Sequence, residues 1–201
     1  MTQRVPVTGA AQAGRGRVRV MTGLTTQAGG DYLCGPALTC ACAPEDNLAV
    51  HAALYQAEPG AVLVCDGAGS RRCALFGELM ATDAANRGLA GLVAAGPIRD
   101  IAGIDGLGFP VWCTGTAPGQ AAKAAVVSVG LPVVVGGVLV ASGDQMIADR
   151  DGVVVVPAAE WPALQDAIAA KEERTRDRLA AGERLADING LDLSRLLPRS
   201  S

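Results

Sequence analysis

Hydrophobic and polar positions form blocks that predict strands alternating with helices along most of the chain. Short aliphatic runs bounded by Gly and Pro predict buried strands, and stretches with an acidic first turn or a glycine stop predict helices. The expected strands cover 33–43, 61–66, 89–95, 111–114 and 153–156, and the expected helices cover 47–57, 77–86 and 158–181, with a short helical turn after residue 100. This order predicts a single compact α/β domain with a mixed sheet and a C-terminal helix.

The stretch 124–141 is long and apolar enough to raise the question of a membrane span. Pro132 and the pair Gly136-Gly137 interrupt it, and valine dominates its composition. Short β-branched runs bounded by Gly and Pro are typical of consecutive buried strands. We therefore expect strands here and no membrane partner.

Three segments follow from the composition along the chain. Residues 1–30 form a divergent N-terminal segment rich in Gly, Thr, Gln and Arg, in which only 18–21 suggests a strand. Residues 31–157 carry the α/β pattern, and 158–201 form a helix and tail expected to pack on the domain or on a neighbouring subunit. No apolar segment of the signal-peptide type opens the chain.

The composition excludes several classes of protein. Half of the 201 residues are hydrophobic, which excludes a disordered chain, and its 26 glycines follow no fixed period, which excludes a fibrous one. Aromatic residues make up only 3%, so the core must consist of Ala, Val and Leu. The net charge of −3 offers no concentrated basic face, and we expect no nucleic-acid partner.

Six cysteines could indicate disulfides or zinc, but their spacing favours neither. No Cys-x-x-Cys pair is present, and the single histidine, His51, lies apart from the cysteines in the sequence. Cys40 and Cys42 alternate along an expected strand and should point to the same face. We interpret the cysteines as reduced, buried thiols of a cytoplasmic protein.

The residues richest in chemistry lie between 77 and 100. Gly77 and Glu78 open a helix directly after a loop, so that the free N–H groups of Leu79 and Met80 can bind an anion. Arg99 and Asp100 follow the next strand, which returns the chain towards the start of that helix. An arginine and backbone amides suit the carboxylate of a small 2-oxo acid, and carboxylates suit Mg²⁺ or Mn²⁺. From spacing alone, helix-dipole compensation and a surface ion pair explain the same residues.

These residues belong to a longer set of motifs that runs from about Gly35 to Gly182. Its pieces are 35–39, 46–49 with His51, 60–67, 77–82, 88–100, 108–111, 132–137, 143–144 and 148–153. Through this set the chain resembles the RraA-like family, which comprises the regulators of ribonuclease activity A and the class II 4-hydroxy-4-methyl-2-oxoglutarate aldolases. The consistent order of these pieces over about three quarters of the chain is more specific than any single motif.

The resemblance implies a β/β/α swivelling-type domain that assembles as a homotrimer or hexamer, and a divalent-metal site. By it, Asp100 anchors Mg²⁺ or Mn²⁺, Glu78 reaches the metal through water, and Glu172 of a neighbouring subunit completes the shell. Arg99 binds the substrate, and Gly77 with the amides of Leu79 and Met80 holds its carboxylate. The first acidic position is Glu in this chain, whereas Asp is common in the aldolases.

Three functions remain open at this point. The first is a class II lyase that cleaves a 4-hydroxy-2-oxo acid to pyruvate, decarboxylates oxaloacetate, or does both through the same pyruvate enolate. The second is a non-catalytic regulator that docks on a ribonuclease or helicase; such a module has no need of Glu78, Arg99 and Asp100. The third is a biosynthetic enzyme that uses the site on another oxo acid, a reading motivated by the divergent N-terminal segment.

Overall fold

The computed structural model describes residues 4–14 and 16–192 of the chain. The strands are β1 (Arg19–Val20), β2 (Thr26–Ala28), β3 (Leu33–Cys42), β4 (Val62–Asp66), β5 (Cys73–Ala74), β6 (Gly91–Ile98), β7 (Val111–Thr116), β8 (Gly119–Gln120), β9 (Val126–Val129), β10 (Val133–Val135), β11 (Val138–Val140), β12 (Gln145–Asp149) and β13 (Gly152–Val156). The helices are α1 (Val7–Ala13), α2 (Leu48–Gln56), α3 (Glu78–Asn86), α4 (Ile101–Leu107), the 3₁₀ turn η1 (Ala158–Glu160), α5 (Trp161–Ala180) and α6 (Leu185–Ile188).

The main sheet is mixed, as the alternation of strands and helices predicts. Its strands lie in the order β1-β13-β12-β3-β4-β6-β7-β2, and β9 pairs with β3 beside this path. The central strands β3, β4, β6 and β7 run parallel, whereas β12 is antiparallel to β3. β3 joins the two halves, because 33–36 pair with β12 and 37–41 pair with β4. The chain folds as a single α/β domain with a C-terminal helix.

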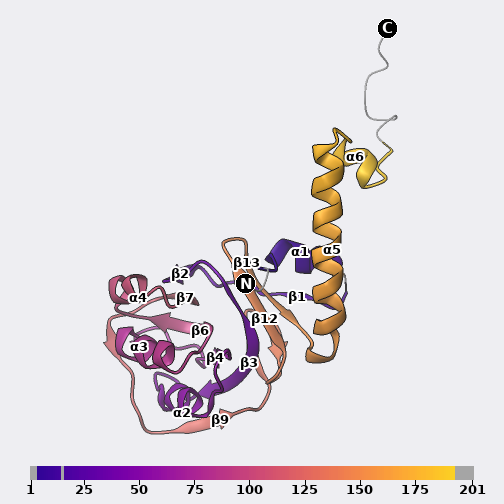
Figure 1. The fold of residues 1–201 in the computed structure, drawn as a ribbon. Helices are drawn as coiled ribbons and strands as arrows, with labels where there is room; N and C mark the ends of the chain where they lie inside the picture. Colours follow the sequence, from indigo (N-terminus) through magenta and orange to yellow (C-terminus); the bar gives the residue numbers. More distant parts are fainter. Residues whose placement is uncertain (1–3, 15, 193–201) are drawn as a thin grey trace.

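Helices α2, α3 and α4 cover one face of the parallel strands (Figure 1). Their buried positions are largely alanines, and Ala49, Ala53, Ala81 and Ala84 have no exposed surface. Small side chains let the helices approach the sheet closely, which suits a core with few aromatic residues. The β10–β11 hairpin covers the opposite face with its valines.

Strand β6 continues past the point at which Gly96-Pro97 was expected to end it. The pairing with β7 shifts in register after Ala94 and then resumes at Pro97 and Ile98. The prediction of a strand end at 95 is therefore wrong, because the irregularity accommodates the proline inside the strand. The extension carries the chain directly to Arg99.

The N-terminal segment contains elements that its composition did not indicate. Helix α1 packs between α5 and β13, where Val7 and Ala10 are buried beside Leu164 and Ile168 of α5. β2 adds to the edge of the sheet at β7. These contacts join parts of the chain that are far apart in sequence, so local pattern could not reveal them. The domain limits at residues 30 and 157 stay a prediction.

The valine-rich stretch 124–141 forms the three short strands β9, β10 and β11, which confirms that it is not a membrane span. Among the described helices, none combines the length and the apolar character needed to cross a bilayer. All six cysteines are free thiols, and Cys40 and Cys42 are buried in the same cluster under α2, as expected. Cys34 and Cys73 are only partly buried, so the expectation of burial is wrong for these two.

Candidate functional site

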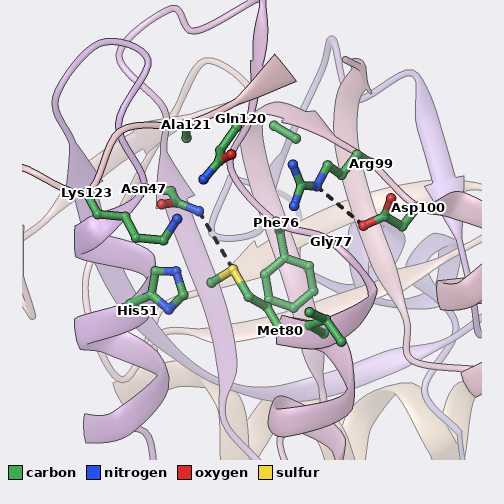
Figure 2. A pocket seen from close by; sticks show the side chains of 12 residues that line it. Asn47, His51, Phe76, Gly77, Met80, Arg99, Asp100, Gln120, Ala121 and Lys123 are labelled. Carbon is green, nitrogen blue, oxygen red and sulfur yellow. Dashed lines mark hydrogen bonds and ion pairs between the residues drawn. The ribbon is translucent and has the colours of Figure 1, made fainter. Parts of the chain in front are cut away.

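A pocket of about 180 Å³ lies where β6 ends and α3 begins, and Arg99 and Asp100 form one of its walls (Figure 2). The backbone N–H of Arg99 donates to the carbonyl of Phe76 at 3.0 Å, which ties the end of β6 to the loop before α3. Arg99 Nε lies 3.4 Å from Asp100 Oδ2, and both side chains are roughly half exposed. The strand-end arginine and carboxylate predicted from the sequence therefore face a common space.

Asp100 holds its place through an unusual backbone conformation. Its φ of 57° and ψ of 42° lie in the left-handed region, which non-glycine residues seldom adopt. Its carbonyl accepts the first hydrogen bonds of α4, from the N–H groups of Gly103 and Ile104. Such conformations cost about 1–3 kcal/mol and cluster at functional sites. The turn lets β6 pass abruptly into α4 and leaves the Asp100 carboxylate beside Arg99.

The start of α3 forms the floor between the walls. Gly77 is the residue before the helix, and Gly77, Leu79 and Met80 all line the pocket, as expected from the sequence. The first intrahelical bond runs from the N–H of Ala81 to the carbonyl of Gly77. The N–H groups of the first turn are therefore open to an anion, and the helix dipole favours one there.

Glu78 lies away from the pocket lining. It is the first residue of α3, and its carboxyl group packs against Gly103 in the first turn of α4. Since Asp100 precedes α4, both carboxylates belong to the junction of α3 with α4, but only Asp100 lines the pocket.

The opposite wall was not identified from the sequence. Asn47 and His51 reach the pocket from the start of α2 (Figure 2). Gln120 reaches it from the end of β8, and Ala121 and Lys123 reach it from the segment between β8 and β9. The spacing of Asn47 and His51, four residues apart on one helix face, was an available signal. Lys123 precedes a run of valines and carries no local pattern of its own. Its place at the pocket depends on contacts between segments that are distant in the sequence.

Asn47 presents an oxygen without a partner among the described residues. Its Nδ2 donates to the carbonyl of Leu75 at 3.0 Å and lies 3.8 Å from the sulfur of Met80. These contacts fix the orientation of the amide, and its buried Oδ1 receives no hydrogen bond. A buried carbonyl without a donor costs about 1–3 kcal/mol.

The electrostatics of the pocket favour an anion. Arg99 and Lys123 supply positive charge from opposite walls, and Asp100 is the one carboxylate among the lining residues. Burial, followed by the nearby Lys123 ammonium, lowers the pKa of His51, against a smaller opposing effect of Asp83. The lowered pKa favours the neutral form of the His51 imidazole at pH 7.

The donors at the Arg99 side suit a hard divalent cation. Mg²⁺ prefers oxygen ligands, retains several waters and commonly uses only one or two protein carboxylates with the substrate. The Asp100 carboxylate offers that donor chemistry at the pocket, whereas Glu78 lies at the neighbouring helix junction outside the lining. No cluster of three or more His, Cys, Asp or Glu residues is present within 4–14 and 16–192. Glu172 lies on α5, and its side chain falls outside the described residues.

Comparison with known proteins identifies the family of this chain. The family model described as RraA-like, Aldolase/RraA, matches residues 7–155. A protein of Halalkalibacterium halodurans is 39% identical over 130 residues and carries the provisional name 4-hydroxy-4-methyl-2-oxoglutarate aldolase. That match covers 65% of this chain and 62% of the relative, so the chain spans less than two thirds of this relative's length.

Two solved structures share the fold under different functional names. One, from Geobacillus kaustophilus HTA426, is described as an S-adenosylmethionine:2-dimethylmenaquinone methyltransferase. It is 36% identical, the match covers 76% of this chain and 94% of that one, and the TM-score is 0.72. The other is Streptomyces coelicolor RraAS2, described as an unusual member of the RNase ES inhibitor RraA family. It is 30% identical, the match covers 90% of this chain and 92% of that one, and the TM-score is 0.73. The family model matches most of the chain, and the chain therefore belongs to the RraA-like, Aldolase/RraA family.

Proposed function

We propose that this chain is a divalent-metal-dependent lyase that acts on small 2-oxo acids. Its reaction is the retro-aldol cleavage of a 4-hydroxy-2-oxo acid to pyruvate, the decarboxylation of oxaloacetate, or both. The observation that carries the proposal is the convergence of Arg99, Asp100 and the first turn of α3 on one pocket. The name of the Halalkalibacterium relative points to the same chemistry.

Each group has a defined part in this proposal. The N–H groups of Leu79 and Met80 bind the substrate carboxylate, and Arg99 donates to that carboxylate and to the keto oxygen. Asp100 would hold Mg²⁺ or Mn²⁺, assisted through water by Glu78 and by Glu172 of a neighbouring subunit in a trimer or hexamer. The metal, when bound, supplies positive charge for the developing enolate.

Cleavage begins at the C4 hydroxyl of the substrate. A base oriented by Glu78 takes the proton of the C4 hydroxyl, and that oxygen becomes the carbonyl of the second product as the C3–C4 bond breaks. The electron pair of the broken bond remains on the pyruvate fragment as an enolate. Arg99 stabilises the negative oxygen of that enolate. Protonation at C3 completes pyruvate. Loss of CO₂ from oxaloacetate leaves the same enolate and needs the same stabilisation.

The far wall favours a substrate with two carboxylates. Lys123 approaches the pocket from the side opposite Arg99 (Figure 2), and no carboxylate side chain lines that wall. A second carboxylate of the substrate would complement the ammonium group. Oxaloacetate and 4-hydroxy-4-methyl-2-oxoglutarate both carry one.

The experiment measures pyruvate release from oxaloacetate and from 4-hydroxy-4-methyl-2-oxoglutarate, with Mg²⁺ and again with a chelator. Release that requires the metal and is lost in Arg99→Ala would support the proposal. A folded protein that releases no pyruvate from either compound would overturn it.

A regulator of ribonuclease activity is the second candidate, because the Streptomyces neighbour covers 90% of this chain and is described as a member of that inhibitor family. A docking module needs neither an open helix N-terminus nor an arginine and a lysine facing one pocket. Isothermal titration with oxalate and Mg²⁺ separates the two candidates, since a pure docking module would bind neither at this pocket.

A further inference from the structure

Asp46 lies behind the far wall of the pocket and is almost completely buried, with 3% of its surface exposed. Its carboxylate accepts three backbone hydrogen bonds. Oδ1 accepts from the N–H of Leu48 at 2.8 Å, and Oδ2 accepts from the N–H groups of Ala124 at 2.7 Å and Ala125 at 3.3 Å. Asp46 does not line the pocket itself. Its contacts nevertheless join the two segments from which that wall is built.

The same two segments are joined by their backbones. The N–H of Asn47 donates to the carbonyl of Ala122 at 3.0 Å, and the N–H of Ala122 donates to the carbonyl of Glu45 at 2.9 Å. Asp46 and Ala122 form an isolated parallel bridge between these bonds. These hydrogen bonds therefore connect the start of α2, which carries Asn47 and His51, with the residues on either side of Lys123.

The segment after Ala121 has no regular secondary structure before β9. Residues 122–125 are exposed and lie outside the named strands, between β8 and β9. Ala124 and Ala125 directly follow Lys123, so their amide positions determine where the Lys123 side chain starts. Burial opposes the charge of Asp46, but the N–H groups of Leu48, Ala124 and Ala125 hold its pKa below the ordinary value. The group is therefore a carboxylate at neutral pH and a strong acceptor for those amides.

From these contacts we infer that Asp46 is a positioning residue for substrate selection: it binds the amides of Ala124 and Ala125 and thereby holds Lys123 at the pocket to receive the second carboxylate of the substrate. This inference rests on the proposed function and deepens it. Asp46 sets a preference for dicarboxylates, whereas Arg99 and the start of α3 bind the 2-oxo acid end, which every substrate shares.

The test compares two ligands by isothermal titration in the presence of Mg²⁺. Pyruvate carries only the 2-oxo acid end, and 2-oxoglutarate adds a second carboxylate. In Asp46→Asn, the side chain keeps its size but offers a single acceptor oxygen, so the amides of Leu48 and Ala124 cannot both be bonded. We expect binding of 2-oxoglutarate to weaken about tenfold, the value of one charge-assisted hydrogen bond, and binding of pyruvate to stay within about twofold.

A double-mutant cycle identifies Lys123 as the intermediary. Lys123→Met should lower the affinity for 2-oxoglutarate by a similar factor, and Asp46→Asn should add little in that background, because the interaction it supports is already gone. Ala124→Pro removes the N–H group that donates the shortest hydrogen bond to Asp46. It should reproduce the ligand selectivity of Asp46→Asn, and it serves as the test if that variant fails to fold.

Asp144→Asn is the matched control. Asp144 is also buried, and its carboxylate also accepts from backbone N–H groups, those of Ala141 and Ala158, while it pairs with Arg19 at 2.8 Å. It precedes β12 and does not line the pocket. Its substitution should leave the ratio of the two affinities unchanged, whatever it does to thermal stability.

The outcomes are distinct. Equal weakening of both ligands in Asp46→Asn, or full additivity with Lys123→Met, would overturn the inference and leave the proposed function standing. A wild-type protein that binds neither ligand would overturn the proposed function and this inference with it.

Discussion

Gly77 and Asp100 approach each other so closely that a side chain at position 77 would displace the Asp100 carboxylate. A Cβ placed on Gly77 would lie 2.8 Å from Asp100 Oδ2 and 3.1 Å from Arg99 Cγ. The φ of −157° at Gly77 is extended backbone that any residue adopts, so the requirement comes from contact alone. The start of α3 thus packs against the end of β6, and the Asp100 carboxylate lies where a side chain of residue 77 would point.

Substitution Gly77→Ala should therefore damage the site without unfolding the protein. The new methyl group would displace the carboxylate of Asp100 and the stem of Arg99. Displacements of about 1 Å at a reacting site can cost about 10²-fold in rate, and we expect a loss of this order in kcat/KM for pyruvate release. Thermal unfolding should show a folded protein. Wild-type kinetics in this variant would mean that the Asp100 position is unimportant for turnover.

A pair of glycines in α4 tests the part of Glu78. A Cβ on Gly103 would collide with the Glu78 carboxyl group, whereas a Cβ on Gly106 would meet nothing within 4 Å. Gly103→Ala should shift Glu78 and lower kcat by about tenfold. Gly106→Ala should retain full activity and gain up to about 1 kcal/mol of helix stability. Equal activity in the two variants would remove Glu78 from the proposed mechanism.

Arg99→Ala tests the centre of the proposed site. Loss of a group that stabilises a developing oxyanion costs about 10²–10³-fold in kcat, and we expect pyruvate release to fall by that factor. Arg99→Lys should recover only part of it, because lysine lacks the planar pair of donors. Arg150→Ala is the control, because it removes one positive charge as well but lies in the exposed turn between β12 and β13. It should leave pyruvate release unchanged. Activity close to that of the wild type in Arg99→Ala would exclude this pocket as the site.

His51 should make the protein less stable in mild acid. Burial and Lys123 lower its folded-state pKa, so below about pH 6.5 the unfolded chain binds a proton that the folded protein does not. The free energy of unfolding therefore falls as the pH drops from that value towards the folded pKa. His51→Gln should remove this part of the pH dependence, as measured by thermal unfolding between about pH 5 and pH 7.5. Parallel profiles for the two proteins would show that His51 does not titrate differently on folding.

Much of the fold follows from local pattern because strands and helices have different periodicities. The parallel strands β4, β6 and β7 and the helices α2 and α3 could each be predicted from a few consecutive residues. The Arg99 side of the pocket followed as well, since a helix and its return strand bring Arg99 and Asp100 back to the start of α3. Irregularities could not be predicted this way, and the continuation of β6 through Pro97 depends on a shift in its pairing with β7.

Only the tertiary structure placed the other half of the site. Lys123 stands 77 residues after Asp46 in the sequence, and it reaches the pocket because the Asp46 carboxylate binds the two amides that follow it. The direction of Glu78 likewise depends on the missing side chain of Gly103 in another helix. Periodicity reports which face of an element is buried. Contacts between distant segments depend on the packing of the whole chain, and the far wall of this pocket consists of such contacts.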